Sequence, residues 1–78
     1  MVKLKMTALL AKRARSKAQG VKVDFKPGLR VTDLIAAEGF SGPDAEAITA
    51  VVNGETVGSD YELSEGMTVE LLVGIAGG

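Results

Sequence analysis

The sequence contains no cysteine, no histidine and no tryptophan. Without cysteine the chain has no disulfide, no thiolate metal ligand and no cysteine nucleophile. Without histidine it lacks the usual general base and the commonest metal ligand. The acidic residues show no metal-ligand spacing, and no phosphate-binding loop occurs. These absences argue against a free-standing catalyst, and we expect the chain itself to bind no metal and no cofactor.

Aromatic residues and long apolar runs are also scarce. Only Phe25, Phe40 and Tyr61 are aromatic, so the core of this 78-residue chain has to be aliphatic. A chain of this length forms one domain with a small core. No apolar run reaches the roughly 18 residues that span a bilayer, and residues 1–5 lack the apolar stretch of a signal peptide. We therefore expect a cytoplasmic protein with no membrane partner.

Positive and negative charges occupy different parts of the chain. All nine basic residues lie at or before Arg30 with a single acid, Asp24, whereas the other nine acids follow without any base. Two oppositely charged halves of one small domain attract each other, and such asymmetry can also steer partners. The basic residues are not interleaved with stacking aromatics, and the acidic half would repel phosphate, so we expect no nucleic-acid partner.

The first half of the chain predicts two strands and a helix. Residues 2–9 alternate apolar and polar side chains, and residues 21–25 do so again after Gly20. The segment 8–19 suits either a basic helical turn or one arm of a long hairpin. After the Pro-Gly turn, residues 31–38 have helical spacing, with Gly39 expected just beyond the helix and Phe40 packing back on it.

The second half predicts three more strands. A loop at 41–44 precedes a β-rich run at 47–52, and Asn53-Gly54 is a strong hairpin signal that leads into a short return strand at 55–57. The last strand covers 67–73. The order β-β-α-β-β-β predicts an α+β fold in which a mixed sheet of four to five strands packs on one main helix.

Directly after the last strand, the sequence ends in Gly77-Gly78. Because glycine lacks Cβ, such an end can enter a narrow channel and bring the Gly78 carboxylate to another protein's active site. The alternative is an ordinary frayed terminus. We expect a folded domain over residues 1–73 and a flexible tail over 74–78.

Three stretches, taken in this order before a terminal Gly-Gly, resemble the ubiquitin-like β-grasp sulfur carriers, namely thiamine-synthesis carriers and small subunits of molybdopterin synthase. They are residues 27–35 at the turn into the helix, residues 50–57 in the hairpin, and residues 63–71 in the final turn and strand, followed by Ile75-Ala76-Gly77-Gly78. The tail is more similar to the thiamine type, because it lacks the proline of the molybdopterin-synthase tail. Arg30 stands where the family commonly has a threonine cap, so that cap is lost or shifts to Thr32.

The resemblance implies a specific chemistry at Gly78. A partner enzyme of the E1-like, adenylating class uses ATP to convert the Gly78 carboxylate into an acyl-adenylate. Sulfur from a sulfur-donor protein displaces AMP and leaves a thiocarboxylate. A sulfur-accepting biosynthetic enzyme, thiamine thiazole synthesis being the favoured pathway, then takes that sulfur. Gly77 and Gly78 serve by lacking side chains, which lets the enzyme surround the acyl group closely.

Docking on these enzymes requires a surface beyond the tail. If Val69, Leu71 and Val73 face the core, the strand period of two places Glu70 and Leu72 outside. Val51 on the neighbouring strand is expected outside as well. Val51, Glu70 and Leu72 thus form a predicted docking patch, continued by Ile75 and Ala76 of the tail, unless the first hairpin covers part of it. Partner bases could pair with the acids Glu55, Glu62 and Glu70.

Two alternatives remain at this point. The chain could be the small subunit of molybdopterin synthase, with its tail inserted into a larger catalytic subunit. It could also be a ubiquitin-like modifier that is joined to lysines of target proteins through Gly78.

Overall fold

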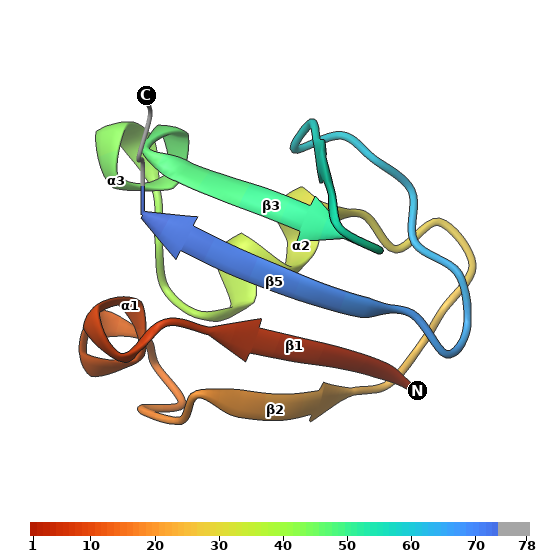
Figure 1. Ribbon diagram of the computed structural model, residues 1–78, viewed down its shortest axis with the longest axis horizontal. Helices are drawn as coiled ribbons and strands as arrows, with labels where there is room; N and C mark the ends of the chain where they lie inside the picture. The colour runs from red at the N-terminus through yellow and green to blue at the C-terminus, as the bar shows by residue number, and fades with distance from the viewer. Residues whose placement is uncertain (74–78) are drawn as a thin grey trace.

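The computed structural model describes residues 1–73 (Figure 1). Within this range the chain forms five strands and three short helices. In chain order they are β1 (Val2–Met6), α1 (Ala8–Arg13), β2 (Gly20–Val23), α2 (Val31–Ala37), α3 (Gly42–Glu46), β3 (Ile48–Val52), β4 (Glu55–Val57) and β5 (Thr68–Val73).

The five strands form one mixed sheet in the order β2-β1-β5-β3-β4. The β1–β5 pair is parallel, and the other three neighbouring pairs are antiparallel. The main helix α2 lies across one face of the sheet, behind it in Figure 1. The predicted α+β fold, with a mixed sheet on one main helix, is confirmed. The strand β5, last in sequence, lies at the centre of the sheet.

Strand alternation builds the core between the sheet and α2. In β1, Val2, Leu4 and Met6 are buried while the two lysines between them are exposed. In β5, Val69 and Leu71 are fully buried. The helix contributes side chains at helical spacing, as the sequence predicted. These residues are Val31, Leu34 and Ile35.

One expected core residue is not in the core. Val73 was predicted to face inward with Val69 and Leu71, but it is 42% exposed. It is the last residue of β5 and pairs with Ile48, the first residue of β3, which is itself only half-buried. The alternation continues to Val73, but the core ends before it reaches this position.

The C-terminal end of α2 has the predicted glycine cap. Gly39 has a φ of 88°, a backbone conformation that favours glycine. Its N–H donates to the Ala36 carbonyl (3.0 Å), and the Phe40 N–H donates to the Ile35 carbonyl (3.2 Å). This pair of bonds is the Schellman motif, and it turns Phe40 back into the core, where it is 7% exposed.

The N-terminal end of α2 compensates for the missing threonine in a different way. Arg30 is the N-cap residue, and its side chain makes no capping hydrogen bond. The Asp33 carboxylate instead accepts a hydrogen bond from the Arg30 N–H (2.9 Å). A shift of the cap to Thr32 is therefore wrong, because Thr32 already lies in the first helical turn. Asp33 also carries the negative charge that the helix N-terminus favours.

The connection after β1 is helical, which decides between the two alternatives for residues 8–19. The strand ends at Met6, and α1 follows with Leu10 and Ala11 buried against the sheet. The rest of the connection is held by Glu38 at the end of α2. The Glu38 side chain accepts from the Ser16 N–H (2.9 Å), and its carbonyl accepts from the Arg15 N–H (2.9 Å).

The segment predicted as a loop at 41–44 is instead part of the short helix α3. Pro43 lies in its first turn, where the missing N–H costs nothing. No α3 residue is buried, so the sequence carried no apolar period to reveal it. The following hairpin is as predicted: Asn53 and Gly54 both have positive φ, at 52° and 80°, as a type I′ turn requires.

The contrast between Leu71 and Leu72 gives a direct test of this sheet. Leu71 is fully buried, whereas its neighbour Leu72 is half-buried on the opposite face. We expect Leu71→Ala to lower the free energy of unfolding by about 3 kcal/mol, because the cavity lies in the core. Leu72→Ala should cost less than about 1 kcal/mol. Urea denaturation followed by circular dichroism measures both, and equal losses would contradict the orientation of β5.

Candidate functional site

The candidate site begins with the strand that leads into the tail. β5 is bonded on one side to β1 and on the other to β3, and its inward residues are fully buried. It ends at Val73, at the left in Figure 1, which is the same end of the sheet as α1 and α3. The predicted reactive residues Gly77 and Gly78, and the predicted contacts Ile75 and Ala76, lie outside the described residues. Val73, the residue before the tail, is thus the last residue of a strand that is hydrogen-bonded on both sides.

Near Val73, the structure brings together the three residues of the predicted docking patch that lie within residues 1–73. Val51 pairs with Glu70 across the β3–β5 ladder, and Leu72 lies two residues further along β5. Their neighbours Val69 and Leu71 are buried toward α2, so Val51, Glu70 and Leu72 share the opposite, outer face of the sheet. Glu70 is exposed, and the two apolar side chains are each half-buried.

The other two acids considered for docking lie elsewhere. Glu55 begins the edge strand β4, and Glu62 lies in the connection before β5, where it forms a single β-bridge with Arg30. Both are exposed. The structure therefore groups Glu70 with the apolar patch and separates Glu55 and Glu62 from it.

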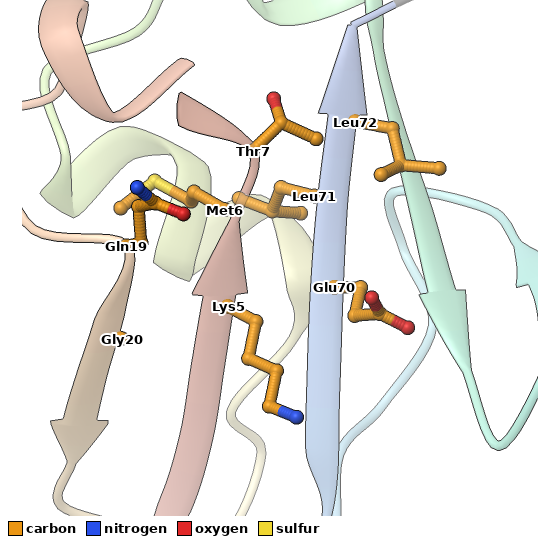
Figure 2. Close-up of a pocket in the computed structure, with 8 residues that line it drawn as sticks. All are labelled: Lys5, Met6, Thr7, Gln19, Gly20, Glu70, Leu71 and Leu72. Carbon is orange, nitrogen blue, oxygen red and sulfur yellow. The ribbon is translucent and has the colours of Figure 1, made fainter. Parts of the chain in front are cut away.

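A hollow that the sequence did not predict adjoins the patch. It has a volume of about 410 Å³ and lies on the outer face between β1, β5 and the start of β2 (Figure 2). Lys5 and Gly20, which pair across β1 and β2, form one side of it, and Glu70 and Leu72 form the other. Figure 2 shows the Glu70 side chain turned toward β3, away from Lys5.

This hollow was missed because it depends on strand register. The alternation of β1 predicts that Lys5 points outward, but only the observed pairing places a glycine opposite it. The sequence signal that could have found it is the position of Gly20 at the start of the second strand. A glycine there leaves the space beside Lys5 unfilled, since no atom beyond its two chain neighbours lies within 4 Å of where its Cβ would be.

The charged halves of the chain meet at two exposed ion pairs within residues 1–73. The amino group of Met1 contacts Glu65, and Arg13 contacts Asp44 at 3.4 Å. Each pair joins a positive group from the first thirty residues to an acid from the remainder. Both pairs are exposed to solvent, so their contribution to stability is small.

Two other kinds of site are absent from residues 1–73. No group of three acidic side chains in this range is placed to hold a metal ion. None of the three helices described is long and apolar enough to cross a membrane.

Comparison with known proteins agrees with this geometry. The sequence matches the ThiS family over residues 8–78. The crystal structure of SAMP1 from Haloferax volcanii superposes with a TM-score of 0.73 at 25% identity, covering 99% of this chain and 98% of that one. A crystal structure of H. volcanii small archaeal modifier protein 1 has a TM-score of 0.73 at 23% identity, covering 95% and 97%, and supports the fold alone.

The family match spans most of the chain, and the β-grasp arrangement that the family resemblance implied is present in the described residues. Members of this family are carriers rather than enzymes, and their general partner is an E1-like activating enzyme. The chain belongs to the ThiS family of ubiquitin-like sulfur carriers.

Proposed function

We propose that this protein carries sulfur as a thiocarboxylate on Gly78 and donates it in cofactor biosynthesis. The observation that carries the proposal is the family match, which extends to residue 78. The structure supports the proposal because β5 is the central strand of the sheet and ends at the residue before the tail. The patch of Val51, Glu70 and Leu72 beside that strand is a suitable contact for the enzymes that handle the tail.

The proposed chemistry takes place at the Gly78 carboxyl group. A carboxylate oxygen attacks the α-phosphorus of ATP in the partner's active site, and pyrophosphate leaves. The acyl carbon of the resulting adenylate then accepts a sulfur nucleophile. With hydrosulfide, the C–S bond forms as the C–O bond to AMP breaks, and one proton is released. The product is a thiocarboxylate that ionises at neutral pH and acts as a nucleophile.

In this proposal the carrier contributes position rather than catalysis. ATP is bound by the activating enzyme, and the carrier needs no cofactor of its own. Gly77 and Gly78 fit a pocket that closes around a planar acyl group, because neither has a Cβ. The absence of cysteine and histidine from the whole chain is consistent with this role.

In this proposal a biosynthetic enzyme accepts the sulfur. We favour thiamine thiazole synthesis, because the segment from Leu72 to Gly78 contains no proline. The small subunit of molybdopterin synthase is the competing assignment within the same chemistry. Stable co-purification with a larger catalytic subunit would favour that assignment.

The decisive test is the intact mass of the protein after incubation with its E1-like enzyme, ATP and sulfide. We expect a mass gain equal to the exchange of one oxygen for one sulfur, located at Gly78 by fragmentation. Omitting ATP should abolish the gain, since no leaving group is then formed. Deleting Gly78 should abolish it too. If neither adenylate nor thiocarboxylate forms with any cognate activating enzyme, the proposal fails.

The docking patch leads to a second prediction. Val51→Ala and Leu72→Ala together should raise the Kd for the activating enzyme about 10-fold, because both changes remove apolar area that the partner would bury on binding. Isothermal titration calorimetry measures the Kd. Thr32→Ala, an exposed change in α2 on the other side of the sheet, is the matched control. Equal affinity of wild type and the double variant would remove the patch from the interface.

A protein-modifier role is the second candidate function. The likeness to SAMP1 from Haloferax volcanii, at 25% identity, favours a SAMP-like small modifier as this alternative. In this role the activated Gly78 acyl group is joined to a lysine amine of a target instead of to sulfur. We expect higher-mass conjugates in cell extract that disappear when Gly78 is deleted, as detected by immunoblot. An extract with thiocarboxylate but no conjugates would leave sulfur transfer as the sole function.

A further inference from the structure

Three lysines gather on the outer face of the sheet, next to the patch but not part of it. Lys3 and Lys5 lie on β1, and Lys22 lies on β2. The antiparallel register pairs Lys3 with Lys22 and pairs Lys5 with Gly20. All three lysines are exposed, and their strand neighbours Val2 and Leu4 are buried on the opposite face. We call these three lysines the lysine strip.

The lysine strip carries little compensating charge. Two like charges directly opposite each other in a ladder destabilise the pair, and Lys3 faces Lys22 in this way. The acid paired with the strip is Glu70, opposite Lys5 in the β1–β5 register, and its side chain turns toward β3 (Figure 2). Neither ion pair found within residues 1–73 includes a member of the strip. The fold therefore holds three positive charges together at a cost.

The strip borders two adjoining hollows, together called the groove, which extend from β2 to β5. A hollow of about 190 Å³ lies between Lys3, Lys5 and Lys22. It shares Lys5 and Gly20 with the larger hollow, whose far side is formed by Glu70 and Leu72 of β5. The groove therefore ends beside Leu72, one residue before Val73, the last described residue of β5.

We propose that the lysine strip is a second docking surface, which receives an acidic surface of the activating enzyme while the tail enters that enzyme's active site. The proposal rests on the proposed function, because it takes the activating enzyme as the partner. Carboxylates on the enzyme would relieve the repulsion between Lys3 and Lys22 as they bind. Opposite potentials on two approaching surfaces also raise the association rate and fix the orientation.

A purely structural explanation of the strip leads to different results. β2 is an edge strand of the sheet, and edge lysines can prevent two sheets from pairing edge to edge. In that case the loss of Lys22 would cause self-association and would leave binding of the enzyme unchanged. The two explanations can therefore be separated with one substitution.

The test uses Lys22→Glu with Lys26→Glu as the control. Both changes alter the net charge equally, but the exposed Lys26 lies after β2 and does not line either hollow. Lys22→Glu places opposite charges across the ladder from Lys3, so we expect an equal or higher Tm. We also expect its Kd for the purified activating enzyme, measured without ATP, to rise about 10-fold at low salt. Lys26→Glu should bind as wild type does.

Salt and competition complete the experiment. The difference in Kd between wild type and Lys22→Glu should shrink at high ionic strength, because salt screens exposed charges. An unchanged Kd in a folded Lys22→Glu protein, or an equal loss in Lys26→Glu, would overturn the proposal. Competition by poly(dT) for the strip with an affinity matching that of the enzyme would identify a general polyanion surface and would also overturn it.

The binding test of the lysine strip gives a result even if the proposed function of Gly78 is wrong. The binding measurement requires neither ATP nor sulfur, so it can be read even if Gly78 is never modified. Conversely, at saturating carrier concentration Lys22→Glu should give the wild-type rate of Gly78 adenylation with a raised KM. A loss of kcat with unchanged KM would contradict a docking role for the strip.

Discussion

The structure depends on the pairing of β5 with both β1 and β3. β1 comes from the start of the chain and β5 from its end, so the sheet is complete only when these two strands lie side by side. The pairing buries Val69 and Leu71 completely, and it places the residues next to the tail at the centre of the sheet. The pairing with β3 also fixes the position of Val73, the last described residue, in the sheet.

The same alternation that fills the core also produces the functional face. Each inward residue of β1, β3 and β5 leaves its neighbours on the outer face, so Val51, Glu70 and Leu72 are placed by the packing of Val52, Val69 and Leu71. Because the two sets point in opposite directions, stability and partner binding can be altered separately. The outer face then divides into a largely uncharged half over β3 and β5 and a positive half over β1 and β2.

The segregation of charge along the sequence thus becomes a segregation in space. The first thirty residues supply β1, α1 and β2, which form one side of the sheet, and the acidic remainder supplies the other. Only two ion pairs join the halves within the described residues, and both are exposed. Most of the charge therefore faces solvent, where it acts on approaching partners at a distance of about one Debye length, or roughly 10 Å at moderate salt.

Local signals in the sequence determined the elements that depend on neighbouring residues. Asn53-Gly54 predicted its hairpin, Gly39 predicted the end of α2, and strand alternation predicted that Leu72 points outward, because turn geometry and side-chain period are properties of short segments. The helix after β1, the short helix α3 and the exposure of Val73 required the tertiary structure, since each depends on where the core ends. The lysine strip and its groove were also decided only there: strand alternation exposes Lys3, Lys5 and Lys22 one by one, but the register of β1 against β2 brings them together.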